Sequence, residues 1–259
     1  MTLSNGLAVV TGAGSGIGRA IAVALAGEGA AVAVVDLNPD TAKETKELIS
    51  GAGGRAKSFQ GDTSKAENLD RAIDEAIAEF GPLEIMVNNA GINDEANVDV
   101  LDEATWRRVI DVDLTGVFLG CKRAIKEMLP RERGRIINIA SVAGLNGTGG
   151  GAAYIAAKHG VIGLTRQMAV TYSAHGITTN AVCPGPVRTS LSQHSHQILG
   201  TGSADAGSGL TDERLQQIVP AGRWGTTEEI ASAVCYLASE EAGYITGHAM
   251  VVDGGFRAR

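Results

Sequence analysis

The chain has 259 residues, of which 44% are hydrophobic, 20% are charged and 35 are glycines. A single α/β domain can reach about 250 residues. The high glycine content argues against a plain helical bundle, and the glycines lack the every-third-residue period of collagen. Lys and Arg number 22 against 29 Asp and Glu, a net charge of -7, whereas nucleic-acid-binding proteins are expected to be basic. We therefore expect one globular domain without a nucleic-acid partner, its glycines gathered in turns and ligand loops.

The cysteines and the apolar segments bear on the cell compartment. Cys121, Cys183 and Cys235 lie far apart, form no CxxC pair and are odd in number, which is typical of reduced thiols in a cytosol. Residues 1–6 lack the basic flank and long apolar stretch of a secretory signal, and no apolar segment approaches about 18 residues. We expect a cytoplasmic protein without a membrane partner.

Short β-branched runs alternate with longer stretches of helical periodicity along the chain. Strands are predicted at Leu7–Thr11, Ala31–Asp36, Lys57–Gly61, Glu84–Asn88, Arg135–Ala140, Thr178–Cys183 and Met250–Asp253. Helices are predicted at Ile17–Glu28, Asp40–Ser50, Ala66–Phe80, Trp106–Leu129 and Tyr154–Ser173, with helix starts marked by Asn38-Pro39 and Thr226-Thr227. This alternation indicates βαβ units, and hence an α/β fold with a parallel sheet covered by helices on both faces.

One segment departs from this alternation. Ser190–Gly209 is rich in Ser, Gly, His and Thr, a composition that predicts a mobile loop or lid over about residues 190–215. Its His194 and His196 have no Cys or carboxylate partner at ligand spacing. We expect no metal site, and we interpret the two histidines as solvated, with contact to a substrate as the alternative.

A glycine turn joins the first predicted strand to the first predicted helix. Gly12, Gly16 and Gly18 form a GxxxGxG pattern there. A strand that leads through such a turn into a helix presents backbone N–H groups and the positive end of the helix dipole to a pyrophosphate. The pattern predicts a dinucleotide site, and the alternative is a tight turn without a ligand.

Asp36 stands at the end of the second predicted strand, eighteen residues after Gly18. A carboxylate at this place accepts hydrogen bonds from the adenosine ribose hydroxyls and repels a 2'-phosphate. Ser15 and Leu37 occupy neighbouring positions where a basic side chain would have bound that phosphate. The sequence therefore favours NAD over NADP, with a simple helix cap as the alternative role of Asp36.

Tyr154 and Lys158 are four residues apart in a predicted helix, so they share one face. At about 4.5 Å and an effective dielectric of about 20, the lysine stabilises the phenolate by roughly 3.7 kcal/mol, which is between two and three pKa units. We expect Lys158 to lower the pKa of Tyr154 into a range useful for acid–base catalysis.

Five motifs in order resemble the short-chain dehydrogenase/reductase family. They are Thr11 to Gly18, Asn88-Asn89-Ala90-Gly91, Ser141, Tyr154 with Lys158, and Pro184-Gly185. The resemblance extends from Leu7 to Gly255 and implies a single Rossmann-type domain over residues 1–259 with a seven-stranded parallel sheet. Residues up to about 140 would form the cofactor half and residues 141–259 the catalytic and substrate half. It also implies a homotetramer, with a dimer as the alternative, assembled through the two long helices and the last strand.

The resemblance also implies roles for individual residues. Tyr154 would exchange a proton with the substrate oxygen, Ser141 would hydrogen-bond that oxygen, and Lys158 would hold the nicotinamide ribose. Asp62 and Thr63 would border the adenine, and Val187 and Thr189 would bind the carboxamide. These residues and those of the motifs together make up the expected cofactor-binding set, which is Gly12, Ser15, Gly16, Ile17, Gly18, Asp36, Leu37, Asp62, Thr63, Asn89, Ala90, Gly91, Tyr154, Lys158, Pro184, Gly185, Val187 and Thr189.

Asp113 is a departure from the family pattern, which usually has asparagine at this position as the fourth catalytic residue. Aspartate keeps the size of asparagine but loses its amide donor. We expect Asp113 to belong to the catalytic set with Ser141, Tyr154 and Lys158, and its proton relay to run mainly through backbone carbonyls at a helix kink.

These features predict an NAD-dependent oxidoreductase that interconverts a secondary alcohol and its ketone. The segments Leu191–Leu199 and Ala143–Ala153 are expected to shape the substrate pocket, and the glycines from Gly144 to Gly151 to leave room for a cyclic or hydrophobic substrate. One alternative is an NADPH-dependent 3-oxoacyl-thioester reductase, and another is a non-catalytic NAD-binding sensor or scaffold.

Overall fold

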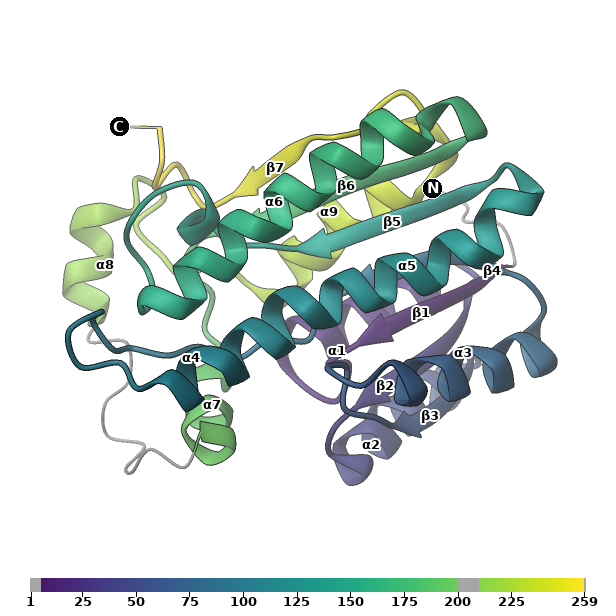
Figure 1. Cartoon of the computed structure of the whole chain (residues 1–259), viewed down its shortest axis with the longest axis horizontal. Coiled ribbons are helices and arrows are strands. Elements are labelled where there is room, and N and C mark those ends of the chain that lie inside the picture. Colours follow the sequence, from purple (N-terminus) through teal and green to yellow (C-terminus); the bar gives the residue numbers. More distant parts are fainter. Residues whose placement is uncertain (1–5, 200–209, 259) are drawn as a thin grey trace.

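The computed structural model describes residues 6–199 and 210–258. All seven strands run parallel in one sheet of order β3-β2-β1-β4-β5-β6-β7 (Figure 1). Their bounds are β1 Leu7–Thr11, β2 Ala31–Asp36, β3 Arg55–Gln60, β4 Leu83–Asn88, β5 Gly134–Ile139, β6 Ile177–Pro184 and β7 Ala249–Val252. The strand order reverses between β1 and β4, and in sheets of this kind ligands bind at the carboxyl ends of the strands beside such a reversal.

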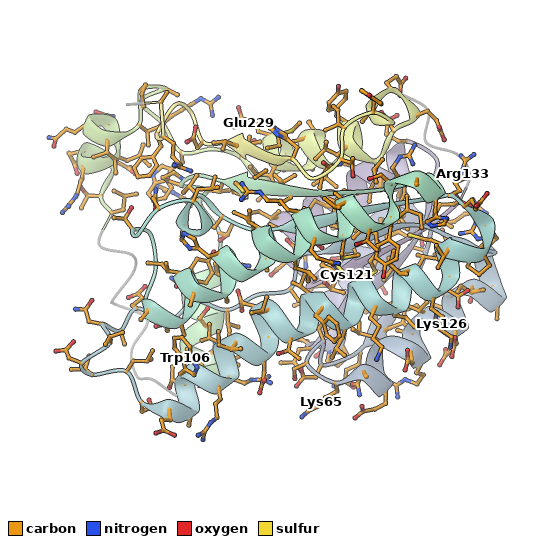
Figure 2. All side chains as sticks on the ribbon, turned by 45° about the horizontal axis from the view of Figure 1, so that its top comes forward. Lys65, Trp106, Cys121, Lys126, Arg133 and Glu229 are labelled. Atoms are coloured by element: carbon orange, nitrogen blue, oxygen red, sulfur yellow. The ribbon has the colours of Figure 1, made fainter. Side chains whose placement is uncertain are left out.

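Helices cover both faces of the sheet (Figure 1). One face carries α1 Gly16–Gly27, α2 Pro39–Gly51 and α9 Thr227–Ala238, and the other carries α3 Ala66–Phe80, α5 Gly116–Met128 and α6 Ala152–Tyr172. Figure 2 accordingly shows Glu229 of α9 on the opposite side of the sheet from Trp106. The shorter helices α4 Glu103–Ile110, α7 Leu191–Leu199 and α8 Asp212–Ile218 lie at the carboxyl end of the sheet (Figure 1).

Two hydrophobic layers result from this arrangement. Val10 and Val32 pack with α1 and α9 on one side, while Val9 and Ala33 pack with α3 and α5 on the other. Neighbouring residues of β1 and β2 are thus both buried, which explains why these two strands are apolar without alternation.

The predicted fold class is confirmed, and each predicted strand bound differs from the observed one by at most two residues. Asn38 begins α2 as expected, since its side chain accepts the N–H groups of Asp40 and Thr41. Thr226 and Glu229 begin α9 with a reciprocal capping box.

The helix predicted at Trp106–Leu129 was wrong in two respects. It begins earlier, at Glu103, because Asp102 caps it by accepting the Thr105 N–H. It is also interrupted by a π-helical turn at Asp111–Thr115, a feature that occurs mostly as single turns inside α-helices and frequently at functional sites.

The loop predicted at about residues 190–215 is also corrected in part. The structure forms α7 at its start and α8 at its end, while residues 200–209 lie outside the described residues. Leu191, Ser195 and Ile198 follow the i, i+4, i+7 spacing of one helix face, and Ser195 is only 1% exposed. Because the segment is mostly polar, its composition predicted a loop although this spacing is that of a helix.

The three cysteines are buried as free thiols. Within residues 6–199 and 210–258, no helix has the length and apolar character needed to cross a membrane.

Candidate active site

A cavity of about 410 Å³ opens at the carboxyl ends of the strands, beside the reversal in strand order. Every residue expected to bind the cofactor lines this cavity, and so does Ser141. Asp113 is the exception among the predicted site residues, because it lies fully buried behind the cavity wall. Segments distant in sequence are thus brought to one place by the ends of β1, β2, β4, β5 and β6.

The glycine turn has the shape of an anion cradle. Gly12 and Gly16 have φ angles of 61° and 52°, a conformation that favours glycine. A Cβ at position 18 would lie 2.1 Å from the Gly12 carbonyl oxygen, so only glycine fits there. Because α1 has no side-chain cap from Ser15 and no acidic residue in its first turn, its N-terminus suits a bound pyrophosphate.

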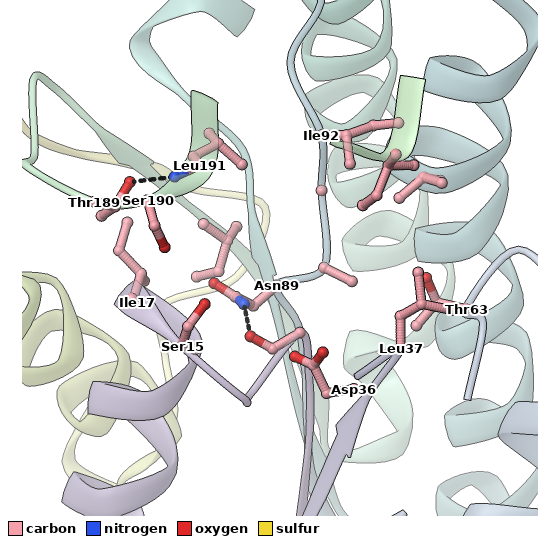
Figure 3. A pocket seen from close by; sticks show the side chains of 18 of the residues that line it. Ser15, Ile17, Asp36, Leu37, Thr63, Asn89, Ile92, Thr189, Ser190 and Leu191 are labelled. Carbon is pink, nitrogen blue, oxygen red and sulfur yellow. Dashed lines mark hydrogen bonds between the residues drawn. The ribbon is translucent and has the colours of Figure 1, made fainter. Parts of the chain in front are cut away.

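Asp36 is held in place by two backbone amides. The Gly14 N–H donates to its Oδ2 at 2.8 Å, and the Asn38 N–H donates to its Oδ1 at 2.9 Å. In Figure 3, Asp36 and Leu37 lie across the cavity from Thr189 and Ser190. Both oxygens of Asp36 thus face a defined direction, as ribose binding requires.

Asn89 ties the segment after β4 to the glycine turn. Its side-chain amide donates to the Thr11 and Gly12 carbonyl oxygens at 2.9 and 3.1 Å. The Thr11 hydroxyl in return accepts the N–H groups of Asn89 and Ala90 at 3.0 and 3.1 Å. These bonds hold two walls of the cavity together.

Arg108 is a lining residue that no sequence motif indicated. It comes from α4 and reaches Asp62 Oδ2 at 3.3 Å. Burial acts to raise the pKa of Asp62, but hydrogen bonds from Ser64 and Arg108 outweigh it and the pKa is lowered. Asp62 is therefore both a turn residue and a cavity residue, and its partner lies too far along the chain for local reasoning to find.

Tyr154 and Lys158 project from α6 toward Ser141, which follows β5. The Lys158 ammonium lies 5.3 Å from the centroid of the Tyr154 ring and donates to the Ile139 carbonyl oxygen at 3.2 Å. Ser141 is close enough to the Tyr154 phenol to act to lower its pKa, and its Oγ accepts the Ala143 N–H at 3.1 Å. The hydroxyl, the phenol and the ammonium thus lie together at the cavity wall.

The expected decrease in the pKa of Tyr154 is not found. Burial raises the pKa of the phenol, Lys158 lowers it, and Asp113 raises it again, so the pKa stays above its ordinary value. The sequence-based estimate included the lysine but neither the burial nor the nearby carboxylate. The free protein therefore holds Tyr154 in its protonated form at neutral pH.

Asp113 sits in the π-helical turn and forms a buried ion pair. Its Oδ2 lies 3.1 Å from Lys158 Nζ, with side-chain exposures of 0% and 4%, and its Oδ1 accepts the Ile92 N–H at 2.8 Å. Burial raises the pKa of Asp113 despite this lysine. For Lys158, burial lowers the pKa, but Asp113 and Tyr154 outweigh it and the pKa is raised. An aspartate in place of asparagine thus puts a counter-charge directly beside Lys158.

Gly144 and Gly150, which precede α6, leave no room for a substrate, contrary to the expectation, whereas Gly147 borders open space. No residue of Ala143–Ala153 lines the described part of the cavity. A Cβ at Gly144 would lie 2.6 Å from the Lys158 carbonyl oxygen, and one at Gly150 would lie 2.5 Å from the Tyr154 ring. These glycines allow the chain to pack closely against α6.

The α7 helix covers the cavity from the other side. Leu191, Gln197 and Ile198 line the cavity, in keeping with the expectation for this segment. Ser195 anchors α7, since its Oγ accepts the Asn93 N–H at 2.8 Å and donates to the Leu191 carbonyl oxygen at 2.7 Å. The side chains of His194 and His196 lie outside the described residues.

Comparison with known proteins finds relatives over nearly the whole chain. The family model described as enoyl-(acyl carrier protein) reductase matches residues 12–257. A 2-(S)-hydroxypropyl-CoM dehydrogenase of Xanthobacter autotrophicus is 44% identical over 99% of this chain and 98% of its own. A cyclohexanol dehydrogenase of an Acinetobacter species is 37% identical over 99% and 96%. The crystal structure of a levodione reductase superposes with a TM-score of 0.89, at 33% identity over 99% of each chain.

The chain belongs to the short-chain dehydrogenase/reductase family. Members of this family are oxidoreductases that use nicotinamide cofactors, and the glycine cradle at the start of α1 fits such a dinucleotide.

Proposed function

We propose that the protein is an NAD-dependent dehydrogenase that interconverts a secondary alcohol and its ketone. The observation that carries this proposal is a single cavity that joins a backbone-held Asp36 to Ser141, Tyr154 and Lys158. Asp36 supports NAD, because its carboxylate suits a ribose diol and repels a 2'-phosphate. The hydroxyl, the phenol and the ammonium support proton exchange at a carbinol oxygen.

Each catalytic side chain has a separate part in this proposal. The glycine turn and Asp36 would hold the nicotinamide cofactor, which would supply an acceptor for the hydride of the carbinol carbon. Tyr154, once deprotonated to the phenolate, takes the hydroxyl proton of the alcohol, and Ser141 hydrogen-bonds the same oxygen and orients it. Lys158 stabilises the phenolate and holds the ribose, while Asp113 holds Lys158 through the buried ion pair. In the reverse direction, Tyr154 returns the proton to the ketone oxygen.

The cavity favours a hydrophobic or cyclic substrate. Ile92, Leu191 and Ile198 provide apolar lining beside the catalytic side chains. The cyclohexanol dehydrogenase among the relatives agrees with such a substrate. A screen of cyclic and acyclic secondary alcohols with NAD, followed by the absorbance of NADH, tests the proposal, and failure to reduce NAD with any of them contradicts it.

Two other functions make different predictions. A 3-oxoacyl-thioester reductase would prefer NADPH, which Asp36 and the absence of a basic side chain at Ser15 and Leu37 disfavour. A non-catalytic sensor or scaffold would have lost Ser141, Tyr154 or Lys158, and all three are present. Turnover with NADH and NADPH on the same ketone separates these functions.

Replacing Asp36 is expected to reduce the preference for NAD. Asp36→Ala removes the acceptor for the ribose hydroxyls and the charge that repels a phosphate. Loss of charged hydrogen bonds of this kind costs about 1.5–3 kcal/mol, so kcat/KM for NAD should fall by roughly tenfold to a hundredfold, and the value for NADP should rise. An NAD/NADP preference equal to that of the wild type would contradict the assignment.

Replacing Asp113 is expected to shift the pH dependence. Asp113→Asn removes a charge that raises the pKa of Tyr154, so that pKa should fall and the acidic limb of alcohol oxidation should move to lower pH. The measurement is kcat against pH for both proteins. An unchanged limb, or a rise in maximal turnover on the order of a hundredfold, would contradict this role.

We also propose that the protein is a cytoplasmic homotetramer, with a homodimer as the alternative. Phe118 of α5, Val170 of α6 and Val251 of β7 are 45%, 89% and 41% exposed. These apolar side chains lie on the two long helices and the last strand, the elements through which family members are expected to assemble. Light scattering of the purified protein measures the number of subunits.

A further inference from the structure

Asp94 is buried beside the catalytic tyrosine, although no sequence motif pointed to it. It lies in the segment between β4 and α4 and is 3% exposed. Its Oδ1 accepts the backbone N–H of Tyr154 at 2.8 Å, and its carbonyl oxygen accepts the Gly151 N–H at 2.7 Å. The first of these bonds connects residues 60 positions apart and ends at the residue that carries the phenol.

The α6 helix has no cap of its own. Its N-cap residue is Gly151, which has no side chain, and its first turn contains no acidic residue. Tyr154 is the third residue of α6, the position whose N–H is ordinarily bound by an N-cap side chain. Asp94 supplies the missing acceptor from another segment, and its charge faces the positive end of the helix dipole.

Close packing holds Asp94 and Tyr154 together. A Cβ at Gly151 would lie 2.1 Å from Asp94 Oδ2, and one at Gly150 would lie 2.5 Å from Tyr154 Cδ1. Asp94 Oδ2 is buried without a hydrogen-bond partner among the described residues, which is costly. An apolar side chain would avoid this cost, so the benefit of the carboxylate must come from Oδ1 and its bond to Tyr154.

The segment that carries Asp94 is itself anchored on both sides. The Asn93 N–H donates to Ser195 of α7, at 2.8 Å. The Ala96 carbonyl oxygen accepts the Ala152 N–H at 3.1 Å. Asp94 therefore lies in a segment that is anchored by hydrogen bonds on both sides, and from there it can fix the position of the start of α6.

We propose that Asp94 is a positioning residue that sets the place of Tyr154 against Ser141 and Lys158 by capping α6. It acts on the chemical step through Tyr154 and touches neither substrate nor cofactor. The kinetic part of this proposal rests on the proposed dehydrogenase function. Since a misplacement of about 1 Å can cost as much as a hundredfold in rate, the cap is expected to affect kcat more than binding.

Two substitutions of Asp94 provide the test. Asp94→Ala removes the acceptor and is expected to lower kcat by about tenfold or more, with KM for NAD changed by less than about threefold. Asp94→Asn keeps an acceptor oxygen and is expected to restore kcat to within about threefold of the wild type. Gly151→Ala, which displaces the carboxylate from the other side, is expected to lower kcat as Asp94→Ala does.

A second readout needs no turnover. Hydrogen exchange of the Tyr154 amide should become faster in Asp94→Ala and remain slow in Asp94→Asn. The matched control is Thr226→Ala, which removes the cap of α9 and is expected to lower the melting temperature without a change in kcat.

Three results would overturn the proposal. These are a kcat of Asp94→Ala within threefold of the wild type, an Asp94→Asn as impaired as Asp94→Ala, or unchanged amide exchange in both variants. If Asp94→Ala does not fold, a wild-type kcat in Gly151→Ala overturns it. A wild type that oxidises no alcohol would refute the proposed function instead, and amide exchange would then decide the role of the cap.

Discussion

Replacing Tyr154 with phenylalanine is expected to lower kcat for alcohol oxidation by roughly a hundredfold to ten-thousandfold. Tyr154→Phe keeps the ring that packs beside Lys158 but removes the phenol oxygen, to which we assign the proton exchange. The residue is only 8% exposed, so the phenol meets little bulk solvent. The measurement is steady-state turnover of a secondary alcohol with NAD.

The expected loss concerns chemistry and not cofactor binding. NAD affinity, measured by calorimetry, should change little, because Lys158 and the glycine turn remain in place. Tyr172→Phe is the matched control, since Tyr172 ends the same helix in a hydrophobic cluster away from the cavity, and it should keep wild-type turnover. Alcohol oxidation by Tyr154→Phe at the wild-type rate would require another general base.

Local sequence patterns predicted most of the fold and the cofactor part of the site. The first strand, the glycine turn and α1 are consecutive in the chain, so their geometry follows from local chemistry alone. Asp36 could be predicted for the same reason, because it ends the next strand. Tyr154 and Lys158 are one helical turn apart, and their shared face needs no tertiary information.

Contacts between distant segments could not be predicted in this way. Arg108 meets Asp62 only because α4 folds over the adjacent edge of the cavity, and Asp94 meets Tyr154 across 60 residues. The pKa of Tyr154 was misjudged for the same reason. Its direction depends on the burial and on Asp113, and both are properties of the folded chain.

The short helix α7 shows a further limit. Its composition is that of a loop, yet Ser195 satisfies its hydroxyl with two backbone groups and is thereby buried. The burial of a polar residue in a helix can be predicted only when its hydrogen-bond partners are known.

Removing Lys158 is expected to destabilise the protein as well as inactivate it. Lys158→Met leaves the Asp113 carboxylate buried without its counter-charge. Breaking one partner of a buried ion pair costs about 3–5 kcal/mol. The free energy of unfolding, measured in urea at neutral pH, should fall by about that amount.

Two further proteins isolate the ion pair. Lys158→Met combined with Asp113→Asn removes both charges and should recover at least about 1 kcal/mol of the loss. Lys43→Met breaks the ion pair between Lys43 and Glu47, whose side chains are 70% and 59% exposed. This substitution should lower the free energy of unfolding by less than about 1 kcal/mol.

The pH dependence of the loss follows from the pKa of Asp113. Because burial raises that pKa above its unfolded value, the charged carboxylate is disfavoured in the folded state at neutral pH, and protonation relieves the penalty as the pH falls. The difference in stability between Lys158→Met and the wild type should therefore shrink in acid. A Lys158→Met protein no less stable than Lys43→Met at neutral pH would show that Asp113 does not depend on the lysine for its charge.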